Sequence, residues 1–144
     1  MGTDEQLQRI LAIPLLAGLP QSIRERVGRV LLEVSSPATL YVGENVFVEG
    51  DEDEHTGCVL LSGEVEVLRG NEEPVRCPAP DLFGEMQQLE ATAQRTATVQ
   101  ATYPSEIRIF NWNDFLAAAG AVLTQEEQIQ LRDALKAAAA QRRQ

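Results

Sequence analysis

The sequence has few of the side chains from which metal sites and nucleophilic active sites are built. It contains two cysteines, Cys58 and Cys77, and a single histidine, His55. Two thiols without a CxxC pair and one imidazole are too few for a zinc site, and no serine or cysteine stands in a nucleophile-elbow context. We therefore predict no metal site, no catalytic residue and no enzymatic activity. The thiols are expected to be reduced and partly buried, and the histidine to lie exposed in a loop.

Positive charge is also scarce. Twelve basic residues stand against 22 acidic ones, which gives a formal net charge of −10. Such a surface repels a phosphate backbone, so we expect no direct binding to nucleic acid. No run approaches about 18 consecutive apolar residues, and the first five residues lack the basic and apolar regions of a signal peptide. The sequence therefore predicts a cytoplasmic protein that does not bind a membrane.

The pattern of hydrophobic residues indicates one domain that is mainly β with flanking helices. A length of 144 residues leaves room for a single domain of ordinary size. Short β-branched or alternating runs begin near Val34 and are separated by turn residues, as in an antiparallel sandwich or jelly roll. The predicted strands are Leu40–Val42, Val46–Val48, Val59–Leu61, Glu64–Val67, Val75–Cys77, Ala97–Val99 and Ile107–Ile109.

Helical periodicity precedes and follows these strands. A helix is predicted over Asp4–Leu11, ahead of Pro14, and a second one begins at Pro20. After the last strand, Asn111 can cap a helix that Gly120 then breaks. Thr124 and Glu127 form a capping box for a last helix that runs through roughly Arg143. Its apolar face is narrow and consists of Leu131, Ala134, Leu135 and Ala138.

An acidic stretch, Glu49–Glu54, separates two of the predicted strands. A calcium loop is one interpretation, but the glycine that should follow and the glutamate at the last loop position are both missing. Runs of like charge normally lie in water. We therefore predict a solvated hairpin loop.

The candidate site lies between Asp81 and Val99. Gly84 has no side chain, so its backbone can approach a ligand closely and adopt an unusual φ. A helical turn over Glu85–Leu89 would direct unpaired N–H groups at an anion, and Arg95 would add a planar fork for phosphate oxygens. Glu85 would accept a hydrogen bond from a sugar hydroxyl. This pattern indicates a clamp for a phosphate and a hydroxyl, although spacing alone also fits an arginine that is solvated or that forms an ion pair.

The stretch Phe83-Gly84-Glu85-Met86, followed by Arg95-Thr96-Ala97-Thr98-Val99, resembles the phosphate-binding cassette of cyclic-nucleotide-binding domains, of the type found in the catabolite activator protein and the cyclic-nucleotide-dependent protein kinases. The resemblance also includes residues 14–19, 42–51, 60–67 and 113–116, and so covers most of the chain. It implies a single domain over 1–144. N-terminal helices would occupy 4–33, an antiparallel jelly roll (double-stranded β-helix) 34–110 with its cassette at 83–99, and hinge and lid helices 111–143.

The resemblance also implies a function, that of a non-catalytic cyclic-nucleotide sensor. Its ligand-binding residues would be Phe83, Gly84, Glu85, Met86, Arg95, Thr96 and Ala97. Arg95 and nearby backbone N–H groups would hold the cyclic phosphate, and Glu85 would bind the ribose 2′-hydroxyl. We rank cAMP first and cGMP close behind, because the threonine after the arginine favours cGMP in some members. No further cofactor is implied.

Ligand binding would move the C-terminal helices and so control a protein partner or a second copy bound through the last helix. The narrow apolar face of this helix fits simple docking onto the core equally well. Gln87, Gln88 and Gln94 depart from the family's usual residues, and the polar pair Gln87 and Gln88 supports an alternative. In this alternative the domain keeps the fold but no longer binds nucleotide, and it serves as an interaction or oligomerisation module.

Overall fold

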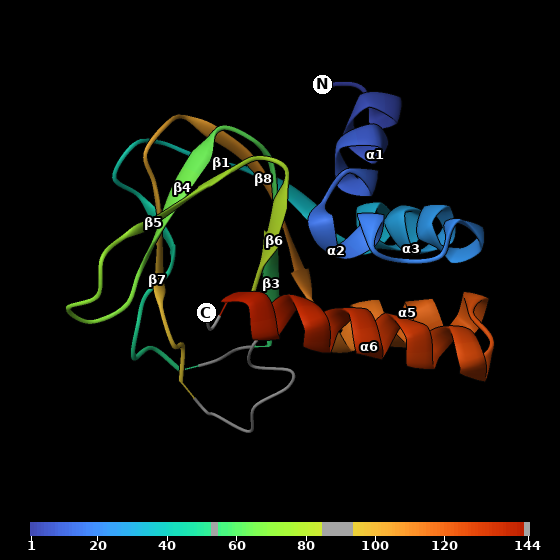
Figure 1. Ribbon diagram of the computed structural model, residues 1–144. Coiled ribbons are helices and arrows are strands. Elements are labelled where there is room, and N and C mark those ends of the chain that lie inside the picture. The colour runs from blue at the N-terminus through green and yellow to red at the C-terminus, as the bar shows by residue number, and fades with distance from the viewer. Residues whose placement is uncertain (53–54, 85–93, 143–144) are drawn as a thin grey trace.

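The fold is an antiparallel jelly roll with helices on one side, as Figure 1 shows in a computed structural model that describes residues 1–52, 55–84 and 94–142. The N-terminal helices are α1 (Thr3–Leu11), α2 (Pro14–Ala17) and α3 (Gln21–Val34), and the C-terminal helices are α5 (Trp112–Val122) and α6 (Gln125–Arg142). The strands are β1 (Ser36–Leu40), β2 (Asn45–Phe47), β3 (Thr56–Ser62), β4 (Glu64–Leu68), β5 (Val75–Pro78), β6 (Asp81–Phe83), β7 (Thr98–Ala101) and β8 (Ser105–Asn111). The predicted fold class is confirmed.

Two four-stranded sheets form the roll, with strand orders β1-β8-β3-β6 and β2-β7-β4-β5. Neighbouring strands are antiparallel throughout these sheets. Strands that follow one another in sequence mostly do not pair, so the chain passes back and forth between the sheets and encloses an interior. Figure 1 shows the sheet that contains β3 and β8 lying nearer to the helices.

Strand β3 is shared by two hydrophobic cores. Val59 and Leu61 pack with the helices, whereas Cys58 and Leu60 face the interior of the roll. Since both faces are covered, the sequence of the strand is a continuous apolar run.

Burial raises the pKa of the Cys58 thiol to about 12. Both cysteines are thiols; Cys77 is half-buried, as predicted, whereas Cys58 is fully buried.

Hydrogen bonds from the Arg108 side chain connect strand β8 of the roll with the N-terminal helices. From β8 its guanidinium donates to Ser35 Oγ at 2.7 Å, to Ser35 O at 2.7 Å, to Gln6 Oε1 at 2.9 Å and to Leu32 O at 3.2 Å. These acceptors satisfy the hydrogen-bonding groups of a partly buried cation, and desolvation lowers the pKa of Arg108.

None of the helices in the described part of the chain is both long and apolar enough to cross a membrane.

The predicted helix starts in the C-terminal part are confirmed. Asn111 Oδ1 accepts hydrogen bonds from the N–H groups of Asn113 and Asp114 at 2.8 and 3.1 Å. The capping box is reciprocal: Thr124 N donates to Glu127 Oε1 at 3.0 Å, and Glu127 N donates to Thr124 Oγ1 at 3.2 Å. On the predicted apolar face of α6, Leu131 and Leu135 are buried, and Ala134 and Ala138 are half-buried.

Three sequence predictions were wrong or incomplete. Gly120 does not break α5, which continues to Val122. The strand predicted at Leu40–Val42 lies earlier, at Ser36–Leu40, where Pro37 occupies an edge strand that tolerates proline. The short elements α2 and β6 were not predicted. His55, Asp51 and Glu52 are exposed, as expected for a solvated loop, and the rest of that acidic stretch, residues 53–54, lies outside the described residues.

Candidate functional site

Arg95 is buried, with only 6% of its surface exposed. Its Nη2 donates to Thr56 O at 3.1 Å and to Thr56 Oγ1 at 2.7 Å. Its guanidinium lies over the ring of Phe47, with Cζ 3.9 Å from the ring centroid. The backbone is anchored too, because Arg95 N donates to Asp51 O at 2.8 Å and Gly50 N donates to Arg95 O at 2.9 Å. Arg95 is therefore not the solvated side chain that its spacing alone would allow.

Gly84 approaches the same two neighbours as Arg95. Its φ is +98°, and a Cβ atom there would lie 2.8 Å from Thr56 O and 3.3 Å from Phe47 Cζ. Thr56 O also accepts from Arg95, and the ring of Phe47 supports the guanidinium. The fold thus brings the predicted glycine and arginine together from positions eleven residues apart in the sequence.

The other predicted site residues are placed differently. Phe83 is 2% exposed and packs in the interior core, opposite Cys58. Thr96 and Ala97, just before β7, are partly exposed. Glu85 and Met86 lie outside the described residues, as does the turn predicted at Glu85–Leu89.

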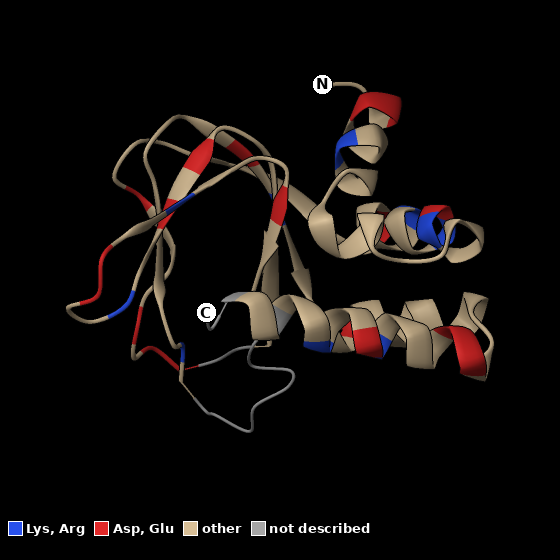
Figure 2. Cartoon of the chain, in the orientation of Figure 1, with Lys and Arg blue, Asp and Glu red and all other residues tan. Residues whose placement is uncertain are grey.

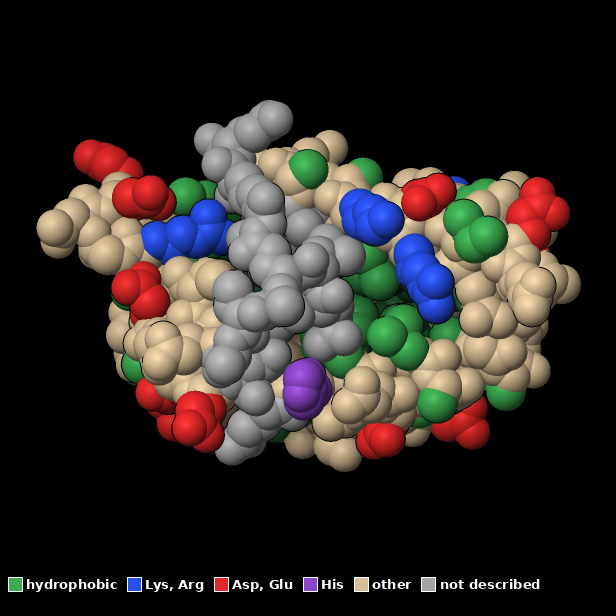
Figure 3. Space-filling model, turned by 90° about the horizontal axis from the view of Figure 1, so that it is seen from below, with side chains coloured by type: hydrophobic (Ala, Val, Ile, Leu, Met, Phe, Trp, Pro, Cys, Tyr) green, Lys and Arg blue, Asp and Glu red, His purple; other side chains and the backbone are tan. Residues whose placement is uncertain are grey.

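A cavity of about 430 Å³ opens between the roll and the helices, a size within the range of small-molecule sites. It is lined by Pro14, Leu15, Val67, Arg69, Glu72, Glu73, Val75, Cys77, Asp81, Leu82, Ala138 and Gln141. Val67 and Cys77 also pack against the interior core that contains Phe47, on which Arg95 stacks. The cavity and the arginine therefore adjoin the same core. Figure 3 shows the lower face of the molecule, where hydrophobic side chains lie beside basic ones.

The sequence predictions missed this cavity. The alternation in β4 places Val65 and Val67 on one side of the strand, which is a usable signal for an inward-facing position. No comparable signal indicates that Ala138 and Gln141 of α6 reach the same space, because that depends on how α6 docks. Acidic residues are spread over the roll and the helices, whereas basic residues are fewer (Figure 2).

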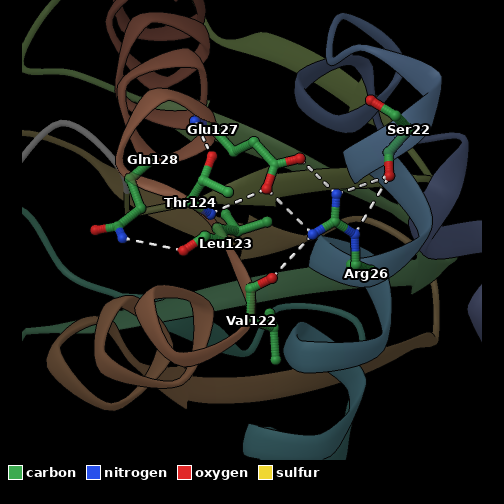
Figure 4. A network of polar contacts seen from close by, with 7 residues as sticks. All are labelled: Ser22, Arg26, Val122, Leu123, Thr124, Glu127 and Gln128. Atoms are coloured by element: carbon green, nitrogen blue, oxygen red, sulfur yellow. Dashed lines mark hydrogen bonds and ion pairs between the residues drawn. The ribbon is translucent and has the colours of Figure 1, made fainter.

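Hydrogen bonds from the Arg26 side chain connect α3 with the junction between α5 and α6 (Figure 4). The Arg26 guanidinium donates to Ser22 O, to Val122 O at 2.9 Å and to both carboxylate oxygens of Glu127. These hydrogen bonds from Arg26, together with the one from Thr124 N, lower the pKa of Glu127 to about 2. The pair fixes the start of α6 relative to the N-terminal helices.

The sequence matches the cyclic nucleotide-binding domain family over residues 38–121, which is more than half of the chain. The chain therefore belongs to this family, and the predicted resemblance is confirmed. No match was found among curated proteins.

Solved structures support the same fold. The sensor domain of the transcriptional regulator DNR from Pseudomonas aeruginosa is 26% identical, with a TM-score of 0.68 over 94% of this chain and 91% of that one. The catabolite activator protein of Thermus thermophilus is 22% identical, with a TM-score of 0.66 over 90% of this chain and 57% of that one, so the chain spans little more than half of its length. The PKAR CBD2 domain, solved with bound Sp-2Cl-cAMPS, is 19% identical, with a TM-score of 0.65 over 84% of this chain and 82% of that one.

Proposed function

We propose that this domain is a non-catalytic cyclic-nucleotide sensor that acts in the cytoplasm. The observation that carries the proposal is the convergence of Arg95 and Gly84 on Thr56 and Phe47. A glycine backbone beside an always-charged, planar donor group suits a phosphate. Arg95 would contact the cyclic phosphate together with the N–H groups of Thr96 and Ala97. Glu85 would accept from the ribose 2′-hydroxyl.

The base would occupy the cavity between the β4–β5 hairpin and α6. Its apolar lining includes Val67, Cys77 and Ala138, which suits a flat aromatic ring better than water. A ligand there would touch both the roll and α6, so it would bind one position of α6 better than another. This differential affinity is what shifts a conformational equilibrium. The output would be the control of a partner, with cAMP as the first candidate ligand and cGMP as the second.

The test is a titration of Arg95→Ala and wild type with both nucleotides. A hydrogen bond to a charged group contributes about 1.5–3 kcal/mol, so Arg95→Ala should weaken affinity at least about 10- to 100-fold. Binding is followed by calorimetry and by the fluorescence of Trp112, which is buried at the start of α5. Arg29→Ala is the control, because it removes an equal charge from an exposed position on α3. Unchanged affinity in Arg95→Ala would refute the proposed phosphate site.

A second candidate function is an interaction or oligomerisation module. Exposed apolar side chains on the C-terminal helices favour it, namely Val122, 44% exposed, and Ile129, 56% exposed. In that case folded wild type would bind neither nucleotide, and sedimentation would detect a dimer that Ile129→Glu disrupts.

A further inference from the structure

We propose that Thr56 and Phe47 are positioning residues, which set the orientation of the Arg95 guanidinium before a phosphate arrives. The inference rests on the proposed function, because it concerns the same site. Both residues belong to earlier strands, β2 and β3, and neither lies in the 83–99 stretch from which the site was predicted. They act on the ligand only through the arginine.

The two contacts constrain different motions of the guanidinium. This group is planar, so its orientation is defined by the tilt of the plane and by rotation within the plane. The face of the Phe47 ring, whose centroid lies 3.9 Å from Cζ, limits the tilt of the guanidinium plane. A ring face offers no directional acceptor, so the stack alone leaves rotation within the plane open.

Thr56 fixes that rotation. Its carbonyl oxygen and its hydroxyl oxygen both accept from Nη2, at 3.1 and 2.7 Å. Nη2 therefore faces β3, and the opposite edge of the guanidinium is turned away from it. A residue of any type at position 56 would supply the backbone carbonyl, whereas the shorter contact requires the hydroxyl of a threonine or serine side chain. The identity of residue 56 therefore matters to the arginine.

Pre-organisation explains why such contacts would affect nucleotide affinity. An unrestrained arginine loses much rotamer freedom when it binds a phosphate. Arg95 is 6% exposed and already has acceptors and an aromatic face around it. The ordering has thus taken place during folding, so a phosphate meets a donor that is already oriented.

The binding test compares Thr56→Val, which removes the hydroxyl at nearly constant shape, with Thr56→Ser, which keeps it. The hydrogen bond from Arg95 already exists without ligand, so Thr56→Val affects binding only through the lost ordering of the guanidinium and should weaken cAMP affinity roughly 2- to 10-fold. Thr56→Ser should restore wild-type affinity, and Phe47→Leu should also weaken binding. Thr39→Val, the same change at an exposed position of β1, should have no effect. Unchanged or tighter binding by Thr56→Val would overturn the inference.

A double-mutant cycle on the ligand-free protein separates this inference from the proposed function. Urea unfolding midpoints are compared for wild type, Thr56→Val, Arg95→Leu and the double variant. If Thr56 acts on Arg95, Thr56→Val lowers the midpoint only when Arg95 is present. Equal shifts in both backgrounds would overturn the positioning role. If wild type binds neither nucleotide but the coupling is present, the sensor function fails while the role of Thr56 in orienting Arg95 stands.

Discussion

At the residue scale, Gly84 combines two requirements that can be measured separately. Its φ of +98° is strained for any side chain, and a Cβ atom would lie 2.8 Å from Thr56 O. We expect Gly84→Ala to lower the free energy of unfolding by more than the about 1–3 kcal/mol typical of a strained φ. Its added methyl group would also displace the carbonyl that accepts from Arg95. Urea unfolding measures the loss.

Gly43 provides the matched control for this substitution. Its φ is +89°, but nothing lies within 4 Å of a Cβ atom added there. Gly43→Ala therefore reports the cost of the backbone conformation alone. Equal losses of stability in the two variants would contradict the close approach of Gly84 to Thr56.

The sequence was informative about this site only where its residues are close together in the chain. Gly84 and Arg95 could be chosen as candidates because both lie in one short stretch with a distinctive pattern. Thr56 reads as an ordinary β-branched strand residue, and Phe47 as an ordinary core residue. Their contacts with Arg95 depend on which strands of the roll lie side by side, and local periodicity does not encode this.

At the scale of elements, the ion pair between α3 and α6 should make stability depend on pH. The hydrogen bonds from Arg26 hold the pKa of Glu127 at about 2, below its usual 4.5. An acid with a lowered pKa in the folded state stabilises that state above its usual pKa, and this contribution is lost as the pH falls toward the lower value. Wild type should therefore lose more stability between about pH 4.5 and 2 than Glu127→Gln does. Unfolding in urea across this range tests it.

Arg26→Gln should remove most of the same pH dependence, because it leaves Glu127 without its cation while the hydrogen bond from Thr124 N, which also lowers the pKa of Glu127, remains. If wild type and both variants show parallel pH profiles, the ion pair does not contribute to the stability of the α5–α6 junction.

The start of a helix was predicted best where a polar side chain caps it by accepting hydrogen bonds from the first backbone N–H groups. The caps at Asn111 and Thr124 are of this kind, because a polar side chain satisfies N–H groups a few residues away. Gly120 was misjudged because a glycine within a helix is disfavoured by only about 1 kcal/mol relative to alanine. Burial of Phe115 and Ala119 on the same helix outweighs that penalty.

At the scale of the whole molecule, α6 connects the helical core with the cavity between the roll and the helices. Leu131 and Leu135 are buried in the helical core, and Ala138, less than one turn beyond Leu135, lines the cavity. Figure 1 shows the last turns of α6 lying beside the roll. The position of the helix therefore depends on packing in the helical core rather than in the core that contains Phe47, while its end borders the space proposed for the base.

Leu135→Ala tests this connection. Removing a buried leucine side chain should lower the free energy of unfolding by about 2–5 kcal/mol, because Leu135 is 3% exposed. Ile129→Ala is the control on the same helix, since Ile129 is 56% exposed and should cost little. If α6 forms part of the nucleotide site, the first variant should also bind cAMP more weakly in calorimetry at a temperature where it stays folded. A folded Leu135→Ala protein with wild-type affinity would show that nucleotide binding does not depend on how α6 is docked, and the proposed conformational output would then have to come from another element.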